Sequence, residues 1–286
     1  MKTELKHPLH SVSQALDNAR RALAPKTDSP RLDAEVLLAH VMRLDRAALL
    51  ARPESALTSE AKVRFEALVA RRAQGEPVAY LIGSREFWSL EFEVSRDVLI
   101  PRAETERLVE AALERIPVQA SARVADLGTG CGAIALALAR ERPRASIVAT
   151  DVSPKALEVA RKNLIRSAIG NVRLLACEWF EAIDAAAFDL IVSNPPYVAD
   201  SDPHLRRGDL PSEPRLALAG GPDGLDAIRL IIAGARERLA DDGALMLEHG
   251  YDQGAAVRRL LENAGFRRIY TLKDYAGHDR VSGGLT

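Results

Sequence analysis

The sequence predicts an α/β fold with a mostly parallel Rossmann-like sheet that ends in an antiparallel hairpin. A small all-helical domain and a β-hairpin linker precede this sheet. The amino-terminal part of the chain shows only helical spacing of apolar residues, whereas strand-length and helix-length segments alternate through the rest. Strands separated by helices are typical of a parallel sheet covered on both faces. The predicted domains are residues 1–83, the linker at 84–100 and residues 101–286.

Three amphipathic segments predict the helical domain, at 11–24, 31–44 and 59–74. Ser29 followed by Pro30 is typical of a cap and a first helical position, and Thr58 is expected to cap the third helix. Gly75 stands where a helix end favours a left-handed residue. We therefore expect a small helical bundle.

Apolar and charged residues alternate over 85–101, which predicts the hairpin linker, and residues 104–116 return to helical spacing. Five strands are then predicted, at 123–128, 145–151, 172–176, 188–194 and 243–250. The helices that separate or follow them are predicted at 132–142, 153–168, 225–240 and 252–265. Two short strands within 267–284 are expected to close one sheet edge as a hairpin.

Composition indicates a globular protein of the cytoplasm. Lys and Arg number 39 against 40 Asp and Glu, so the net charge of −1 gives no global field that would attract nucleic acid. Two cysteines are too few for a disulfide framework, and the first residues lack the apolar stretch of a signal peptide. The near-neutral charge leads us to expect no stable binding to nucleic acid. Because no segment reaches 18 uninterrupted apolar residues, we also expect no membrane association.

A glycine-rich turn follows the first predicted strand of the sheet. Gly128, Gly130 and Gly132 alternate with Thr129 and Cys131, which lets the backbone turn sharply and approach a ligand at the start of a helix. A dinucleotide-binding turn would have GxGxxG, with its third glycine inside the helix, whereas this spacing is GxGxG. The turn is therefore expected to bind a different cofactor.

Two acids end neighbouring strands of the predicted sheet. Asp126 precedes the glycine turn and would repel a pyrophosphate, but it suits a ligand with positive charges such as S-adenosylmethionine. Asp151 can accept hydrogen bonds from both ribose hydroxyls of an adenosine, whether the cofactor is a dinucleotide or S-adenosylmethionine. The alternative for either acid is that it only caps the following helix.

Trp179 follows the next predicted strand at the same sheet edge, where an adenine could stack on its ring. The alternative is that the ring only packs under a loop. Cys131 and Cys177 have no His or acid at metal-ligand spacing, so we interpret both side chains as small apolar fillers and expect no metal.

The fourth strand of the sheet ends in Asn194, Pro195, Pro196 and Tyr197. A planar NH₂ group needs two acceptors, which the Asn194 side-chain oxygen and the Pro195 carbonyl can supply, and a ring against its flat face, which Tyr197 can supply. The rigid prolines hold this arrangement in advance. If the cofactor lies across the glycine turn, these residues face its methyl group. Asn194 is then predicted to contact both cofactor and acceptor, with Pro195 and Tyr197 as the other catalytic residues.

Glu248 and His249 end the fifth predicted strand, near the same edge. The sequence leaves open whether either side chain acts at the site or only packs.

Together, these motifs resemble those of a known class of enzymes. The text "DLGTGCGAIAL" with "NPPY" resembles the class I methyltransferases that modify planar amino groups. The flanking text "GEPVAYLIGSREFWSLEFEVSRDVLIPRAETERLVE", "SDPHLRRGDLPSEPRLAL" and "LMLEHGYDQG" is similar to the release-factor glutamine methyltransferases of the HemK/PrmC family. The resemblance extends from about Asp33 to Val281.

The resemblance implies N5-methylation of the glutamine in the Gly-Gly-Gln motif of class I peptide chain release factors. S-adenosylmethionine would be the methyl donor and S-adenosylhomocysteine the product. The segment Gly128 to Gly132 would bind the methionine part, Asp151 the ribose and Trp179 the adenine, while Asn194 to Tyr197 would hold the glutamine amide. The helical domain would help to bind the release factor.

One stretch departs from the family pattern. Residues 100–106 are "IPRAETE", where the family usually has IPRPDTE. The second proline is lost, and Glu104 replaces a shorter acid at an expected helix cap, where Asp is preferred. A sister group that modifies a glutamine of a ribosomal protein has an apolar or Ser-Pro version, so this stretch is closer to the release-factor form.

Two other functions compete with this one. Enzymes that methylate adenine N6 or cytosine N4 share the Asn/Asp-Pro-Pro-Tyr turn, but they call for base flipping and a positively charged cleft or recognition domain, which the near-neutral charge disfavours. A nucleotide-binding regulatory module or an oxidoreductase could use the same α/β fold. The GxGxG spacing and the Asn-Pro-Pro-Tyr turn count against it.

Overall fold

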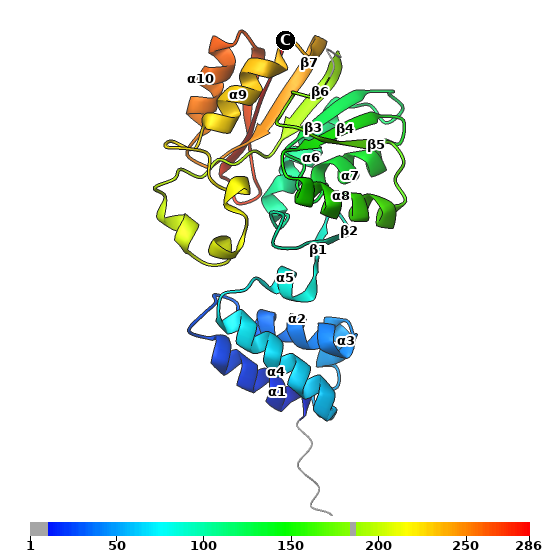
Figure 1. Ribbon diagram of the computed structural model, residues 1–286, viewed down its shortest axis with the longest axis vertical. Coiled ribbons are helices and arrows are strands. Elements are labelled where there is room, and N and C mark those ends of the chain that lie inside the picture. Colours follow the sequence, from blue (N-terminus) through cyan, green and yellow to red (C-terminus); the bar gives the residue numbers. More distant parts are fainter. Residues whose placement is uncertain (1–10, 184–186) are drawn as a thin grey trace, which may run out of the picture. The chain divides into compact units, whose positions relative to one another are not determined.

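The computed structural model describes residues 11–183 and 187–286. The chain separates into two compact units, whose elements are labelled in Figure 1. The first unit holds the residues up to Gly83 together with Arg207–Ser212, and the second holds Ser84–Arg206 and Glu213–Thr286. The helical unit therefore includes a short segment that comes from far along the chain.

Among its described residues, the helical unit contains five α-helices. They are α1 (Val12–Leu23), α2 (Pro30–Met42), α3 (Arg46–Leu50), α4 (Ser59–Ala73) and α5 (Val78–Ile82). Ser11 and Gln14 form a capping box at α1, and the Thr58 hydroxyl accepts from the Ala61 N–H to cap α4. The short helices α3 and α5 were not predicted, because one and a half turns carry too little periodicity to detect.

Ser29 precedes α2 and Pro30 is its first residue, as predicted, but the expected side-chain cap is absent. The Ser29 hydroxyl donates instead to Asp33 Oδ1 at 2.8 Å. The other Asp33 oxygen pairs with Arg72 of α4 at 2.7 Å, and Arg72 also pairs with Asp209 at 2.6 Å. A nearly buried guanidinium therefore holds segment 207–212 on the helical unit.

The second unit begins with a hairpin of β1 (Ser84–Phe87) and β2 (Leu90–Glu93). Trp88 and Ser89 between them both have positive φ, as a two-residue type I′ turn requires. The hairpin packs on the same unit, because the Asn163 side chain of α8 (Pro154–Ser167) accepts from the Glu93 N–H at 2.6 Å and donates to the Glu93 carbonyl at 3.0 Å.

A seven-stranded sheet forms the body of the second unit (Figure 1). Its strands are β3 (Arg123–Leu127), β4 (Ser146–Asp151), β5 (Val172–Ala176), β6 (Phe188–Ser193), β7 (Leu239–Glu248), β8 (Arg267–Lys273) and β9 (Asp279–Leu285). They are ordered β5-β4-β3-β6-β7-β9-β8. The first five pair in parallel, and β9 pairs antiparallel with both β7 and β8. The predicted α/β class with its carboxy-terminal hairpin is confirmed.

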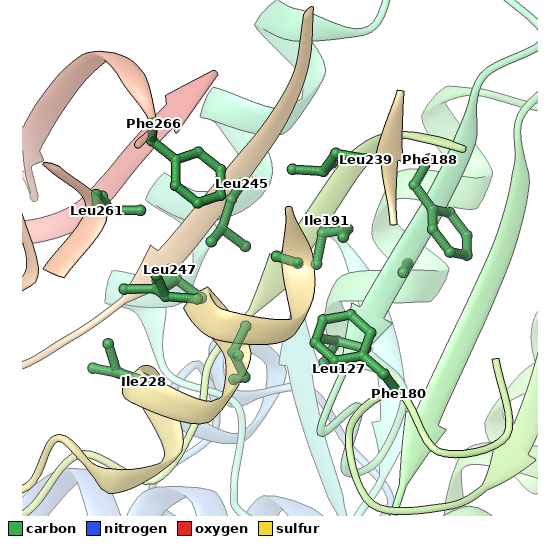
Figure 2. Packing of buried hydrophobic residues seen from close by; sticks show 14 of the residues in the cluster. Leu127, Phe180, Phe188, Ile191, Ile228, Leu239, Leu245, Leu247, Leu261 and Phe266 are labelled. Atoms are coloured by element: carbon green, nitrogen blue, oxygen red, sulfur yellow. The ribbon is translucent and has the colours of Figure 1, made fainter. Parts of the chain in front are cut away.

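Helices cover this sheet. These are α6 (Glu106–Arg115), α7 (Ala133–Glu141), α8, α9 (Asp226–Ala235) and α10 (Gly254–Asn263). The same unit also contains the short helices η1 (Ala103–Thr105), η2 (Pro203–Arg206) and η4 (Arg215–Ala217), while η3 (Leu210–Ser212) lies in the helical unit. Figure 2 shows Ile228 of α9, Leu261 of α10 and Phe266 packed near Leu245 and Leu247 of β7. These residues belong to one buried cluster that also includes Ala125 and Leu127 of β3 and Phe188 and Ile191 of β6. The buried residues of α6 and α7 do not belong to it, as expected if these helices cover the other face of the sheet.

The boundary between α9 and β7 was predicted wrongly. A helix was expected to continue to residue 240, but α9 ends at Ala235 and β7 begins at Leu239. Leu239 pairs with Phe188 of β6 and is buried, so a partner some fifty positions earlier in the chain overrides the local helical spacing.

Candidate active site

The order of the strands places a ligand site at one edge of the sheet. The chain runs outward from β3 to β4 and β5 and then returns to the other side of β3 with β6. A crevice forms at such a reversal, outside the carboxyl ends of the strands. Leu127 of β3 is in register with Ser193 of β6, and the Ser193 hydroxyl donates to the Leu127 carbonyl at 2.7 Å. The glycine turn and the Asn-Pro-Pro-Tyr turn therefore begin side by side.

A pocket lies at this edge, within the second unit. Its walls come from the segment before η1, the glycine turn, the ends of β4 and β5, the turn after β6 and the segment around η4. The lining residues are Asp97, Val98, Leu99, Pro101, Arg102, Thr105, Gly128, Thr129, Gly130, Cys131, Ala133, Ile134, Asp151, Val152, Ser153, Ala156, Cys177, Glu178, Trp179, Asn194, Pro196, Pro214, Leu216 and Ala217. Most predicted site residues are therefore brought together.

The glycine turn needs glycine for its backbone. Gly128, Gly130 and Gly132 all have positive φ, and Gly132 is the residue before α7. The Gly130 N–H donates to Asp151 Oδ2 at 2.8 Å, and the Thr129 N–H donates to the Thr150 carbonyl at 2.8 Å. The turn is thus held against the end of β4 before any ligand arrives.

Asp126 is fully buried beneath the turn and does not line the pocket. Its Oδ2 accepts from the Thr129 hydroxyl at 2.7 Å and from the Ala135 N–H, in the first turn of α7, at 3.1 Å. The capping alternative is therefore part of its role. Its Oδ1, however, is buried with no hydrogen-bond partner among the described residues. Burial raises the pKa of this carboxyl to about 7, so a positive ligand nearby would stabilise its charge.

Asp151 lines the pocket with a carboxylate that two backbone groups orient. Its Oδ1 accepts from the Ser153 N–H at 2.9 Å, and its Oδ2 accepts from Gly130. Burial raises the pKa of this carboxyl above its usual range. A carboxylate oxygen has two lone pairs, so each oxygen can accept one more hydrogen bond from a ligand hydroxyl.

Trp179 lies beyond β5 with a positive φ of 42°, and its ring forms one wall of the pocket. A Cβ atom on Gly128 would lie 3.5 Å from this ring, so the glycine turn approaches it closely. The indole Nε1 is buried without a hydrogen-bond partner in the described part of the chain. Cys177 also lines the pocket, which its interpretation as a filler did not anticipate.

Asn194 is oriented by a residue of η1. Its Nδ2 donates to the Thr105 hydroxyl oxygen at 3.1 Å. The amide nitrogen is therefore engaged, and Oδ1, at the other end of the planar group, is left for the pocket that Asn194 lines. Pro195 and Tyr197, together with Asp126 and Gly132, are the predicted site residues that do not line the pocket.

Tyr197 is held from two directions. Its hydroxyl donates to Glu248 Oε1 at 3.2 Å, and its carbonyl accepts from Gln253 Nε2 at 2.9 Å. A strip of chain that includes Gly220 and Gly224 lies against the same turn. A Cβ atom on Gly224 would lie 2.2 Å from the Tyr197 carbonyl oxygen.

Sequence interpretation missed the residues that join the outer walls of the pocket. Glu213 is buried, pairs with Arg102 and accepts from the Ile100 N–H at 3.0 Å. This carboxylate thereby holds the segment before η1 beside the segment that leads to η4. "IPRAETE" and "SEPRLAL" both belong to the family resemblance, but neither stretch indicates that the other is its partner.

The departure at Glu104 has a smaller consequence than expected. Glu104 is an exposed residue within η1, and Thr105 rather than Glu104 precedes α6. Thr105 supplies no side-chain cap, because its hydroxyl is turned toward Asn194. The prediction that Glu104 occupies a helix cap is wrong.

Residues 11–183 and 187–286 include no cluster of three or more His, Cys, Asp or Glu side chains placed to hold a metal ion. None of their helices is long and apolar enough to cross a membrane.

The arrangement combines two features at one edge. Acids and a ring surround the glycine turn, which suits a cationic ligand with an adenosine part. Beside them, Asn194 presents an acceptor to a planar N–H donor. Such a site can align a weak nitrogen nucleophile with an activated carbon.

Comparisons with known proteins agree with this geometry. A family model described as the PrmC N-terminal domain matches residues 14–83, and one described as the methyltransferase small domain matches residues 105–207. A release factor glutamine methyltransferase of Xylella fastidiosa is 53% identical over 254 residues, covering 89% of this chain and 92% of that protein. One of Vibrio cholerae is 49% identical over 274 residues, covering 95% and 96%.

Among solved structures, a 16S rRNA methyltransferase of Thermus thermophilus has a TM-score of 0.52 at 24% identity, covering 71% of this chain and 49% of that one. That likeness shows the fold alone. Identity near one half over nearly the full length of the curated relatives shows more, and the chain belongs to the release factor glutamine methyltransferase family.

Proposed function

We propose that this protein transfers a methyl group from S-adenosylmethionine to the side-chain amide nitrogen, N5, of the glutamine in the Gly-Gly-Gln motif of class I peptide chain release factors. S-adenosylhomocysteine is the second product. The observation that carries the proposal is the orientation of Asn194, whose amide oxygen is left for the pocket next to the glycine turn. Family membership supports the choice of glutamine over a base.

The residues present fit S-adenosylmethionine. Asp151 has lone pairs free for the ribose hydroxyls, and Trp179 offers a ring for the adenine. Asp126, with its unpartnered Oδ1, supplies negative charge beneath the turn that would hold the methionine part. That part of the site is formed by Gly128, Thr129, Gly130, Cys131 and Gly132. When bound, this cofactor supplies a methyl group activated by its sulfonium.

The acceptor amide is held by the turn after β6. An amide nitrogen is a poor nucleophile because its lone pair is delocalised into the carbonyl. Asn194 Oδ1 and the Pro195 carbonyl would each accept one of its two hydrogens, and Tyr197 would lie against its flat face. Holding both hydrogens in plane turns the lone pair toward the methyl carbon, and positioning of this kind can contribute up to roughly 7–11 kcal/mol. The nitrogen gains a methyl group and releases one proton to solvent, so the methylated amide is neutral.

The two units are assigned different tasks in this proposal. The helical unit, matched by the PrmC N-terminal family model, contributes to binding of the release factor. The second unit binds the cofactor and carries out the transfer. A protein of translation would act in the cytoplasm, without membrane association and without stable binding to nucleic acid.

Asp151→Ala is expected to weaken S-adenosylmethionine binding by about 1.5–3 kcal/mol, because hydrogen bonds to a charged group contribute that much. Isothermal titration calorimetry measures the change in Kd. Asp189→Ala is the matched control, since the Asp189 carboxylate also accepts a backbone N–H, from Arg123, but Asp189 does not line the pocket. An unchanged Kd in Asp151→Ala would contradict its role at the ribose.

Binding of S-adenosylmethionine is expected to weaken by about tenfold as the pH falls from 8 to 6, because Asp126 takes up a proton near pH 7 and loses its charge. S-adenosylhomocysteine lacks the sulfonium charge, so its affinity should change less. In Asp126→Asn the difference between the two ligands should no longer depend on pH. Equal pH dependence for both ligands in the unmodified protein would contradict a charge interaction.

The acceptor is tested by incubating the protein with methyl-labelled S-adenosylmethionine and a release factor, a ribosomal large-subunit protein or DNA. We expect label on the release factor only, and mass spectrometry of its peptides should place the methyl group on the glutamine of the Gly-Gly-Gln motif. Replacing that glutamine by asparagine in the release factor should prevent labelling. Label on DNA alone would indicate a nucleic-acid methyltransferase and overturn the proposal.

A further inference from the structure

Glu248 and His249 are both buried at the end of β7, yet their surroundings differ. The ring of His249 is engaged at both nitrogens, with Nδ1 2.8 Å from the Gly250 carbonyl and Nε2 2.7 Å from the Ser282 hydroxyl. Burial lowers the pKa of this imidazole, which favours its neutral form. His249 is thus accounted for by local structure at the junction of β7 and β9.

Glu248, in contrast, contacts the machinery of the site. Its Oε1 accepts from the Tyr197 hydroxyl at 3.2 Å. The Thr105 hydroxyl accepts from Asn194 Nδ2 at 3.1 Å. Thr105 also lowers the pKa of the Glu248 carboxyl, as a hydroxyl that can donate to it does. One buried side chain is therefore linked to the turn after β6 by a hydrogen bond and to the segment before α6 by its electrostatics.

The number of available protons decides which group donates and which accepts in the series Asn194, Thr105 and Glu248. A carboxylate can only accept hydrogen bonds, and a hydroxyl has one proton to give. If Thr105 donates its proton to Glu248, it can only accept from Asn194, and the group that Asn194 presents must be its NH₂. The Asn194 oxygen is then left for the acceptor amide.

Glu248 is a costly residue for the fold. It is 1% exposed, Oε2 has no hydrogen-bond partner among the described residues, and the guanidinium of Arg280 nearby is paired with Asp274. An ionised carboxylate in such a place destabilises the folded state, and residues with this effect are retained where they serve function. If position 248 served packing alone, an apolar side chain would stabilise the fold more.

We infer that Glu248 is a positioning residue which, through the Thr105 hydroxyl, sets the orientation of the Asn194 amide and, through a direct hydrogen bond, holds the Tyr197 ring for the acceptor glutamine. This inference rests on the proposed function for its substrate. Its structural part, the orientation of the Asn194 amide, does not depend on which acceptor is used.

The kinetic test compares Glu248→Gln with Thr105→Val and Thr105→Ser. The glutamine introduced by Glu248→Gln could present either an oxygen or an NH₂ to Thr105, so the polarity of the chain would no longer be determined. We expect kcat to fall by at least about tenfold in Glu248→Gln and in Thr105→Val, with the Kd of S-adenosylmethionine within about twofold of wild type. Thr105→Ser keeps the hydroxyl and should retain most activity. The double variant should lose no more than the worse single variant.

Glu104→Gln is the matched control, because it removes an exposed carboxylate next to Thr105 and should leave kcat at pH 8 unchanged. Multiplied losses in the double variant, or a cofactor Kd that weakens in parallel with kcat, would overturn the inference. So would a folded Glu248→Gln variant with full kcat. If Glu248→Gln does not fold, the inference is tested by comparing the kcat of Thr105→Val with that of Thr105→Ser.

The pH profile of kcat supplies a readout that a packing role would not move. Burial raises the pKa of Glu248 to about 7; Arg280 of β9 and the hydrogen bonds from Thr105 and Tyr197 lower it, and Glu104 of η1 raises it. A protonated Glu248 can donate to the Thr105 hydroxyl. Thr105 would then donate to Asn194, which reverses the direction of both hydrogen bonds. At saturating cofactor, kcat should therefore fall about tenfold from pH 8 to pH 6 in the wild type, and this limb should be absent in Glu248→Gln.

Stability gives a second independent readout. A carboxyl whose pKa is raised on folding contributes stability that is full below its unfolded pKa and is lost as the pH rises through about 7. Glu248→Gln should therefore have a Tm at pH 8 equal to or above that of wild type. A clear loss of Tm at pH 8 would mark Glu248 as structural.

A measurement without any acceptor separates this inference from the proposed function. The side-chain NH₂ of Asn194 should give a nuclear magnetic resonance signal with slow hydrogen exchange, which Thr105→Val and Glu248→Gln should accelerate by about tenfold or more. Unchanged exchange in both variants would overturn the inference, even if release factor is methylated. Failure of the wild type to label release factor, with the exchange result as expected, would instead contradict the proposed function.

Discussion

Asn194→Ala is expected to lower kcat for methyl transfer by at least about 100-fold, because misplacement of a reacting group by about an ångström has that effect. The substitution removes the oxygen proposed to hold one hydrogen of the acceptor amide. It leaves the glycine turn, Asp151 and Trp179 in place, so the Kd of S-adenosylmethionine should change by less than about threefold. Transfer of label at saturating cofactor gives kcat, and calorimetry gives Kd.

A second asparagine of the same unit separates catalysis from stability. Asn171 donates its side-chain NH₂ to the backbone carbonyls of Ala139, Arg142 and Ala145, and it does not line the pocket. Asn171→Ala should lower the Tm and leave kcat near wild type. If Asn194→Ala instead lost cofactor affinity in proportion to activity, the division of tasks between the two turns would be refuted.

The parts of the site that could be predicted are those that follow strand ends. Asp151, Trp179 and Asn194 each come just after an apolar segment, and parallel strands bring their carboxyl ends to one edge of a sheet. Local spacing was therefore enough to place them together. It was also enough for the glycine turn, because its positive φ angles are a property of three glycines at alternate positions.

The parts that were missed depend on contacts between distant segments. Thr105 and Asn194 are 89 positions apart, Tyr197 and Glu248 are 51 apart, and Arg102 and Glu213 are 111 apart. No periodicity or motif within a short window carries such information. The role of Glu248 could be argued only after the registers of β6 and β7 were known, because these registers bring the end of β7 beside the turn after β6.

The structure was also needed to decide between the alternative roles of Asp126 and Asp151. Asp126 does cap α7, as the less specific interpretation held, yet one of its oxygens is left unpartnered under the turn, among the residues described. Asp151 orients the glycine turn through Gly130 while it lines the pocket. Capping and ligand binding were treated as competing explanations, but a carboxylate has enough lone pairs for both.

Gly224→Ala is expected to lower kcat by at least about 100-fold, although residue 224 does not line the pocket. Gly224 has a φ of +74°, and an added Cβ would lie 2.2 Å from the Tyr197 carbonyl oxygen and 2.7 Å from Gln253 Nε2. The Tyr197 carbonyl is a backbone group, so it can yield only if the turn that carries Asn194 and Tyr197 moves, and the Gln253 side chain is hydrogen-bonded to the same carbonyl. The left-handed conformation adds about 1–2 kcal/mol of strain for a residue with a Cβ atom. Kinetics with a release factor and the Tm from thermal unfolding measure the two effects.

Gly170→Ala is the control for this substitution, because an added Cβ atom there would meet no described atom within 4 Å and the φ of Gly170 is not in the left-handed region. It should retain the kcat and the Tm of wild type. The Kd of S-adenosylmethionine in Gly224→Ala should also stay within about threefold of wild type, since the strip around Gly224 contacts the acceptor turn and not the glycine turn. Full activity in Gly224→Ala would mean that the turn after β6 tolerates displacement. The rigidity of Pro195 and Pro196 would then have no role in catalysis, and the proposal that catalysis depends on a preformed acceptor site would fail.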